Sequence, residues 1–198
     1  MKIAILAGEV SGDRYGALLA GRLRAAAPGV SLAGAGGAAM RAAGVSMLAE
    51  MPAAAMGFTD VLARLPPFRR AFRRIVAALT ADPPDLAVLI DNPGFNLRVA
   101  GAVGPRIPCW YYIPPKVWAH GRGRIAEMRR GLRGVVAAFP FEKELYERAG
   151  IPCAWFGHPV LDIVPPEPET GPVRAAAGDG PLAGFLPGSR AGEVSRLM

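Results

Sequence analysis

The sequence predicts an α/β fold, a Rossmann-like parallel sheet with helices on both faces. Short apolar segments such as "KIAILA" (2–7) and "DLAVLID" (85–91) alternate with longer segments of helical periodicity, which is the pattern of βαβ units. The expected strands are apolar throughout, as strands are when helices cover both faces of their sheet. The polar sequences that follow them are expected to line one crevice, because ligands of such sheets bind at the carboxyl ends of strands.

Strands are expected wherever a short apolar run is bounded by turn residues. The runs are 2–7, 30–37, 85–91, 108–113, 134–139 and 153–156. Helices are expected where apolar residues recur at three- and four-residue intervals, over 14–27, 38–44, 57–81, 122–131 and 141–150. Ser11 or Asp13 can cap the first helix, Gly44 ends the second, and Pro66-Pro67 is expected to break the third.

The composition is that of a globular chain, since 198 residues with 52% hydrophobic content can bury a core. No apolar run approaches the roughly 18 residues of a membrane span. The apolar start "MKIAILAGE" is too short for a signal peptide, so we expect a cytosolic chain. Cys109 and Cys153 lack the spacing of a metal site, and we expect reduced thiols.

The net charge of +7 favours anionic partners such as phosphorylated small molecules, nucleic acid or an acidic membrane surface. Nucleic acid is the weakest of these, because aromatic residues make up only 8% and no groove-reading or stacking motif is present. The segment 56–79 mixes large apolar residues with five arginines. It fits either a helix on an anionic membrane or a helix that packs on the sheet with its arginines in solvent.

Asp91 is the first candidate for chemistry, because it ends a wholly apolar strand and precedes the turn sequence "NPGFN". A partly desolvated carboxylate at that place suits a general base, and a capping role is the alternative. Glu9, Ser11 and Asp13 follow the first strand. Their acids suit a polar ligand such as a sugar better than a pyrophosphate, and simple capping is again the alternative.

Three further features have weaker interpretations. "GAGGAA" (34–39) fits the G-x-G-x-x-A pattern of dinucleotide-binding folds. Arg190 lies in "PGSRAGEV" at an expected strand–turn–helix junction, where a guanidinium suits a diphosphate, or is a surface arginine. His120 and His158 lack metal-ligand spacing; for His158 we expect a packing or hinge role, with a ligand contact as the alternative.

Six motifs occur in one order along the whole chain: "LAGEVSGD", "MGFTDVLARLP", "LIDNPGFN", "YYIPPKVWAH", "FPFEKELYERAGIPCAWFGHPVLD" and "LPGSRAGEV". Together they resemble the lipid-A-disaccharide synthase family, over residues 2–198. The resemblance implies the N-terminal half of a GT-B fold, which has two Rossmann-like domains. It implies transfer of 2,3-diacylglucosamine from UDP-2,3-diacylglucosamine to lipid X (2,3-diacylglucosamine 1-phosphate), with inversion and without a metal or other cofactor. The products are UDP and a β-1,6-linked disaccharide 1-phosphate.

The resemblance also implies roles for residues. Asp91 takes the proton from the acceptor's 6-hydroxyl, and Arg190 steadies the UDP phosphates. Other substrate contacts are Glu9, Ser11, Gly12, Asn96, Ser189 and Glu193. A lipid patch that meets the cytoplasmic face of the inner membrane comprises Met56, Phe58, Val61, Leu62, Leu65, Phe68, Arg69, Arg70, Phe72 and Arg73. Gly94, Pro114-Pro115 and His120 depart from the family's usual residues, which bears on the local acceptor contacts.

The Pro- and Gly-rich sequence after "GHPVLD" predicts a linker. We expect an acceptor-side domain over 1–160, a linker over 161–181, and the start of an incomplete UDP-binding domain over 182–198. Such a fragment is expected to be inactive alone. Three alternatives remain open: a non-catalytic module that binds acceptor lipid or membrane, half of an NAD(P) oxidoreductase, and a GT-B enzyme for another UDP-sugar.

Overall fold

The computed structural model describes residues 1–51, 61–119, 121, 123–164, 171–178, 180–181 and 183–184. These residues form a seven-stranded sheet in the order β3-β2-β1-β4-β5-β6-β7, with every neighbouring pair parallel. The strands are β1 (Lys2–Ala7), β2 (Ser31–Gly36), β3 (Ser46–Glu50), β4 (Leu86–Ile90), β5 (Cys109–Tyr112), β6 (Gly134–Ala137) and β7 (Cys153–Trp155). The predicted fold class is confirmed.

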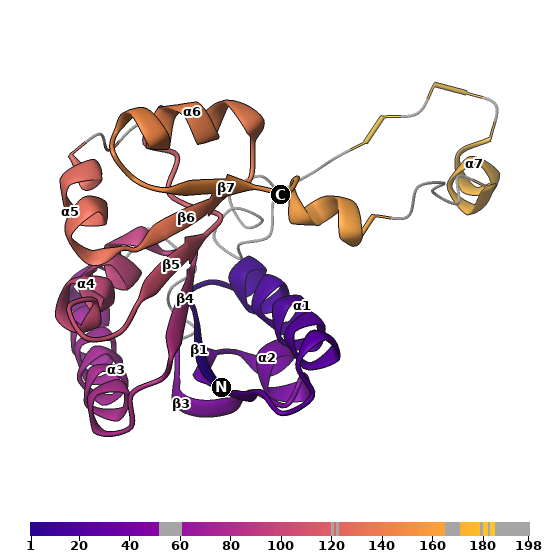
Figure 1. The fold of residues 1–198 in the computed structure, drawn as a ribbon. Helices are drawn as coiled ribbons and strands as arrows, with labels where there is room; N and C mark the ends of the chain where they lie inside the picture. The colour runs from indigo at the N-terminus through magenta and orange to yellow at the C-terminus, as the bar shows by residue number, and fades with distance from the viewer. Residues whose placement is uncertain are drawn as a thin grey trace.

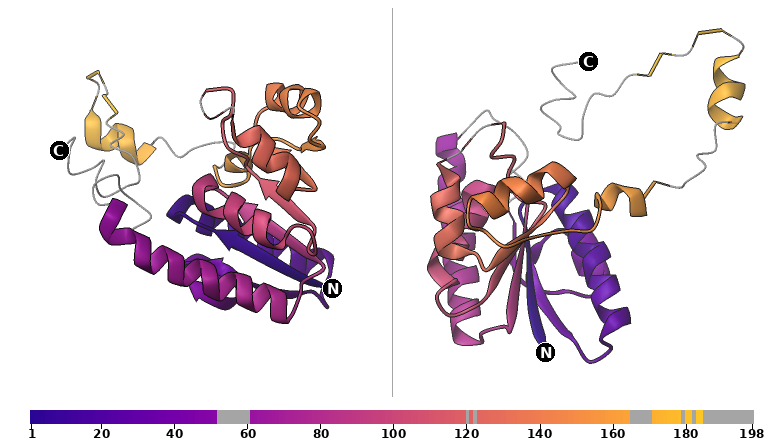
Figure 2. Two further views of the ribbon diagram at one scale, coloured as in Figure 1. Left: turned by 90° about the vertical axis from the view of Figure 1, so that its left-hand side faces the viewer. Right: turned by 45° about the horizontal axis from the view of Figure 1, so that its top comes forward.

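Helices lie on both faces of the sheet (Figures 1 and 2). One face carries α1 (Val10–Ala26) and α2 (Ala38–Ala42), and the other carries α3 (Val61–Ala81), α4 (Pro93–Val103), α5 (Arg124–Gly131) and α6 (Pro140–Arg148). Side chains of β1 alternate between the two cores, with Ile3 and Ile5 beside α1 and Ala4 and Leu6 on the opposite side. Burial on both faces explains why the strands are apolar throughout.

Three elements differ from the sequence-based expectations in their presence or in where they begin. The edge strand β3 was not predicted, because "SMLAE" lacks the β-branched residues that mark a strand. Helix α4 was not predicted either, although Asn92 caps it and Pro93 occupies its first turn. Helix α1 begins at Val10, so Ser11 and Asp13 lie in its first turn and not in a loop.

Helix α3 is continuous through Pro66 and Pro67, so the predicted break is wrong. The two prolines lack backbone N–H groups, which removes two hydrogen bonds near the start of the helix. The helix persists because its later turns are fixed by burial, with Ala71, Ile75 and Leu79 in the core.

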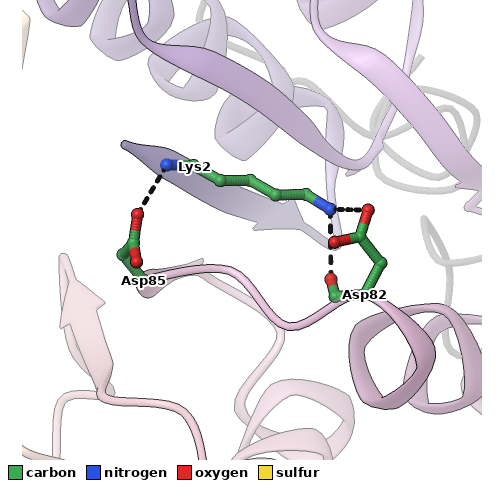
Figure 3. A network of polar contacts seen from close by, with 3 residues as sticks. All are labelled: Lys2, Asp82 and Asp85. Atoms are coloured by element: carbon green, nitrogen blue, oxygen red, sulfur yellow. Dashed lines mark hydrogen bonds and ion pairs between the residues drawn. The ribbon is translucent and has the colours of Figure 1, made fainter.

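The amino end of the sheet is tied together by Lys2 (Figure 3). Its backbone N–H donates to Asp85 Oδ2 at 2.8 Å. Its Nζ donates to the Asp82 carbonyl at 3.1 Å and pairs with the Asp82 carboxylate. These contacts fix the turn between α3 and β4 beside the start of β1, at the edge opposite the carboxyl ends of the strands.

After β7 the chain forms a 3-10 helix, Pro159–Asp162, and a short helix α7, Gly171–Ala177. In Figure 1 α7 lies apart from the sheet. It falls within the predicted linker, and the proposed domain boundaries remain predictions. None of the described helices combines the length and apolar character that crossing a membrane would require. Both cysteines are free thiols, and Cys109 is buried.

Candidate active site at the carboxyl end of β4

Asp91 lies where the strand order changes direction. Strands β1 and β4 are neighbours in the sheet although β2 and β3 lie between them in sequence, which makes their carboxyl ends a topological switch point. Asp91 directly follows β4, and Gly8 directly follows β1. The Gly8 N–H donates to Asp91 Oδ1 at 2.8 Å. The carboxylate therefore lies at the place where open parallel sheets bind their ligands.

The backbone of this site is left-handed, with φ of 50° at Asp91 and 39° at Asn92. Such a conformation costs a non-glycine residue about 1–3 kcal/mol and persists only where its surroundings fix it. Here Asn96 Nδ2 donates to the carbonyls of Ile90 and Asp91, at 2.9 Å each. The Tyr111 hydroxyl also donates to the Asp91 carbonyl. These bonds hold the turn that places the Asp91 side chain over the end of the sheet.

Burial raises the pKa of Asp91 to about 7, and the nearby charge of Glu9 adds to the increase. The Gly8 hydrogen bond and the closeness of the Gly12 and Glu9 N–H groups act in the opposite direction. Asp91 Oδ2 is buried and accepts no hydrogen bond of normal geometry. A carboxylate with one unbonded oxygen and a pKa near neutrality can accept a proton from a hydroxyl group at physiological pH.

Glycine at position 12 allows the first turn of α1 to approach Asp91. A Cβ at Gly12 would lie 1.8 Å from Asp91 Oδ2, and a Cβ at Gly8 would lie 2.3 Å from the Asn92 Cβ. No side chain fits at those distances. The glycines of "LAGEVSGD" are therefore explained by the contact between the β1–α1 turn and the β4–α4 turn.

Asp13 binds a different part of the chain from the one expected. Its carboxylate accepts the N–H groups of Gly37, Ala39 and Met40, at 2.7, 2.9 and 3.1 Å. Asp13 thus caps the neighbouring helix α2 on the same face of the sheet and not its own helix. The N–H groups of "GAGGAA" that would bind a dinucleotide pyrophosphate are already bonded to a carboxylate, which weighs against the oxidoreductase alternative.

The other residues predicted to contact a substrate fall into three groups: two are near Asp91, one supports its backbone, and three lie outside the described residues. Glu9 is the N-cap residue of α1 and Ser11 is exposed in its first turn, so both are near Asp91. Asn96 is only 1% exposed and supports the Asp91 backbone; its amide nitrogen is not available to a substrate. Three residues, Ser189, Arg190 and Glu193, lie outside the described residues, as does His120.

His158 caps the 3-10 helix by accepting the Val160 N–H at 3.1 Å.

The predicted lipid patch is only partly described. Phe68 and Phe72 are half-buried and pack on Phe95, with ring centroids 6.0 and 6.2 Å apart. Arg69, Arg70 and Arg73 are exposed. Met56 and Phe58 lie outside the described residues, and nothing is described of the side chains of Val61, Leu62 and Leu65. On the described turns, α3 therefore presents arginines to solvent and turns its aromatic rings towards the core.

Glu142 is a buried carboxylate at the same end of the sheet that the sequence analysis did not single out. It is only 1% exposed, yet both carboxylate oxygens are bonded. Oε2 accepts the N–H groups of Ala138 and Phe139, at 3.2 and 3.1 Å, and Oε1 accepts Trp118 Nε1–H at 3.0 Å. The signal was present, because a glutamate at the third position of a helix often bonds back to its N-cap.

Comparison with known proteins gives the same family as the motifs. A family model described as lipid-A-disaccharide synthetase (LpxB) matches residues 3–198. The lipid-A-disaccharide synthase of Alkalilimnicola ehrlichii is 42% identical over 99% of this chain and 53% of its own length. That of Trichlorobacter lovleyi is 40% identical over 100% of this chain and 53% of its own length. The chain thus spans about half the length of these relatives.

Solved structures at low identity share the fold. A UDP-GlcNAc 2-epimerase from Neisseria meningitidis superposes with a TM-score of 0.60 at 11% identity, over 82% of this chain and 47% of that protein. Acinetobacter baumannii MurG superposes with a TM-score of 0.50 at 12% identity, over 85% of this chain and 47% of that protein. In both, the likeness covers about half of the longer protein.

Proposed function

Because the chain belongs to the lipid-A-disaccharide synthetase family, we propose that Asp91 is the general base of a glycosyl transfer between two acylated glucosamines. The donor is UDP-2,3-diacylglucosamine and the acceptor is lipid X. The observation that carries this assignment is the buried, unbonded Oδ2 of a carboxyl group whose pKa is about 7. It lies at the switch point of the sheet, beside the first turn of α1, in which Ser11 is exposed.

In the proposed step, the acceptor's 6-hydroxyl gives its proton to Asp91 Oδ2 while its oxygen attacks the donor's anomeric carbon. The new carbon–oxygen bond forms as the bond from that carbon to the UDP phosphate breaks. UDP leaves with the bonding electron pair. Attack from the side opposite UDP inverts the anomeric centre and yields the β-1,6 linkage. Glu9 and Ser11, at the start of α1, are proposed to contact the acceptor sugar.

The test is UDP release from UDP-2,3-diacylglucosamine in the presence of lipid X. Because the chain spans about half the relatives' length, it is assayed alone and fused to the remaining length of the Alkalilimnicola relative. We expect little turnover by the chain alone and robust turnover by the fusion. Asp91→Asn should lower kcat of the fusion by about 10²–10⁴-fold, whereas Asp82→Asn, at the opposite edge of the sheet, should not. Full activity of Asp91→Asn would refute the assignment.

We further propose that the exposed arginines of α3 bind an anionic membrane surface, and that Ser189, Arg190 and Glu193 contact UDP. Arg69, Arg70 and Arg73 support the membrane contact because three exposed guanidinium groups lie within two turns of one helix. Replacing the three with glutamine should weaken sedimentation with anionic vesicles, most clearly at low salt. Replacing Arg129 and Arg130 on α5 is the control.

The non-catalytic binding module remains the second candidate, and the same exposed arginines favour it. It predicts vesicle binding by the chain together with a fusion that releases no UDP. Turnover by the fusion that depends on Asp91 excludes it.

A further inference from the structure

An exposed tryptophan is held rigidly at the carboxyl edge of the sheet. Trp118 is 42% exposed, yet its indole Nε1–H is bonded to the carboxylate of Glu142, which is 1% exposed. Burying a carboxylate is unfavourable unless its hydrogen bonds are made. The Pro115 carbonyl, in the same segment as Trp118, also accepts the Tyr146 hydroxyl. Two buried polar groups of α6 therefore fix a segment whose tryptophan faces solvent.

Trp118 and Phe141 form the aromatic wall of a groove of about 480 Å³. The two rings meet edge to face at 5.3 Å, and Phe141 is 52% exposed. Val117, Ile125 and Leu145 contribute the aliphatic lining. This volume lies within the range of small-molecule sites, and rigid aromatic and aliphatic walls are typical of them.

The charges around the groove do not favour an ionic occupant. Its two charged lining residues, Glu144 and Arg148, pair with each other at 2.5 Å. Each charge has a partner of opposite sign, so an incoming anion or cation would have to displace one of them. A neutral, apolar group fits the lining without that penalty.

The position of the groove relates it to Asp91. Asp91 follows β4, Trp118 follows β5 and Phe141 follows β6, and these are successive neighbours in the sheet. Two strand spacings amount to about 10 Å. The segments that carry Trp118 and Phe141 therefore leave the sheet at the same end as Asp91, and this placement favours a substrate of Asp91 that carries a long flexible apolar substituent.

We propose that the groove between the Pro115–Ala119 segment, α5 and α6 binds one fatty acyl chain of the acylated sugar. This inference rests on the proposed function, because it is the diacylglucosamine substrate that supplies an acyl chain near Asp91. The groove then selects substrates by chain length, with Trp118 as its rigid wall.

A second, larger groove of about 770 Å³ is the competing place for the chain. Trp110, Tyr112, Val136 and Ala154 line it on the α1 side of the sheet, together with Phe156. The floor of this groove is a face of the parallel sheet. Because α/β proteins cover such faces with helices, a helix is a more typical occupant of it than an acyl chain. It lacks an exposed ring fixed by a buried carboxylate, so we assign the acyl chain to the Trp118 groove.

The three tryptophans of the chain allow a direct test. Chain 1–198 is labelled with 5-fluorotryptophan, and the ¹⁹F resonances are assigned by single Trp→Phe variants. Trp118 reports the proposed groove, Trp110 reports the larger groove, and Trp155, which donates to the Ala138 carbonyl, lines neither. The probes are N-acylglucosamines with chains of 8, 10 and 12 carbons, each below its critical micelle concentration.

We expect a saturable shift of the Trp118 resonance, with the Kd falling about fourfold for each added methylene. Phe141→Ala should weaken binding about tenfold or more, because it removes an exposed wall without touching the core. Phe156→Ala is the matched control, since this aromatic residue is 86% exposed and lines the other groove. It should leave the Kd at Trp118 unchanged.

A saturable shift of Trp110 in place of Trp118 would overturn the proposal in favour of the larger groove. So would equal shifts of all three resonances, or a Trp118 shift that appears only with lipid vesicles, which would indicate a bilayer contact. The proposed function is judged separately by the Asp91→Asn fusion. If that variant is inactive and no acyl binding is seen at Trp118, only the groove assignment fails.

Discussion

Two carboxyl groups at the carboxyl edge of the sheet show how differently this fold uses the same side-chain chemistry. Glu142 accepts three hydrogen bonds, which engage both of its oxygens. Asp91 accepts one well-formed bond, from Gly8, and leaves Oδ2 without any. Both groups are withdrawn from water. Satisfied hydrogen bonding is typical of a structural carboxylate, and its absence at Asp91 fits the proposed role of that residue as a base.

The backbone conformations at Glu142 and Asp91 also differ. Glu142 occupies the first turn of a regular helix, whereas Asp91 and Asn92 are held in the left-handed region by Asn96 and Tyr111. The region around Glu142 gains stability from its polar bonds. Around Asp91, hydrogen bonds of the same kind hold a turn whose backbone conformation is unfavourable. Removing the charge of the two carboxyl groups should consequently have opposite effects on stability.

Glu142→Ala should give the largest loss. It leaves Trp118 Nε1–H and the N–H groups of Ala138 and Phe139 without their acceptor, and the free energy of unfolding should fall by about 3 kcal/mol. Urea denaturation of the chain measures it. The control is Glu144→Ala on the same helix. Glu144 forms an exposed ion pair with Arg148, so its loss should cost at most about 0.5 kcal/mol. Equal losses would mean that the Glu142 bonds add little.

Asp91→Asn should instead stabilise the chain, by an amount that depends on pH. Burial raises the pKa of Asp91 to about 7, whereas an unfolded aspartate ionises near 3.9. Between these values the folded state holds the extra proton, so wild-type stability falls as pH rises through the interval. The neutral amide removes this penalty. We expect a gain of about 2 kcal/mol at pH 8, discounted for partial exposure, and almost none at pH 4.

Urea denaturation at pH 4, 6 and 8 distinguishes this outcome from a simple packing effect. A difference between wild type and Asp91→Asn that is the same at all three pH values would show that the carboxyl group ionises normally. The same variant should be the inactive one in the UDP-release assay. That pairing of a stability gain with a loss of activity is the signature expected of a reactive carboxylate and not of a structural one.

Two glycines of α1 sharpen the comparison by a smaller effect. Gly21 has no atom within 4 Å of a built Cβ, whereas a Cβ at Gly12 would strike Asp91 Oδ2. Gly21→Ala should stabilise the helix by up to about 1 kcal/mol. Gly12→Ala should destabilise the chain by about 1–2 kcal/mol, because Asp91 must move. Thermal unfolding measures both. A stabilising Gly12→Ala would show that α1 does not rest against Asp91.

The sequence was sufficient to predict six of the seven strands and the position of Asp91 at the carboxyl end of β4, because both depend on local pattern. Apolar runs predict strands that are covered on both faces, and an acid directly after such a run must lie at the ligand edge. Contacts between different elements of the fold left no such local signal. Nothing near Asp13 indicates that its carboxylate caps α2, and nothing near Asn96 indicates that its amide binds three main-chain carbonyls.

Local rules also failed where the core overrode them. Pro66-Pro67 predicts a break, yet α3 continues because the next turns bury Ala71 and Ile75. The lipid patch over 56–73 stays a prediction, and of its aromatic residues Phe68 and Phe72 pack on Phe95. A one-dimensional pattern shows that a helix is amphipathic. It does not show which of its apolar residues the neighbouring helix will cover.

The smallest expected effect separates support of the Asp91 backbone from support of the Pro115–Ala119 segment. Tyr111 and Tyr146 are both buried and both donate to a main-chain carbonyl, Asp91 in one case and Pro115 in the other. Burial raises the pKa of each hydroxyl above 10, so both remain donors at pH 8. Replacing either with phenylalanine should lower the free energy of unfolding by about 1 kcal/mol.

Only Tyr111→Phe should change how stability depends on pH. Without its bond the left-handed turn can relax, water reaches Asp91, and the pKa of the carboxyl group moves down from about 7 towards its ordinary value. The interval over which stability falls should then end at a lower pH, whereas Tyr146→Phe should leave that interval unchanged. Identical pH profiles for the two variants would mean that Asn96 alone is sufficient to hold the turn, and that the tyrosine contributes packing but not positioning.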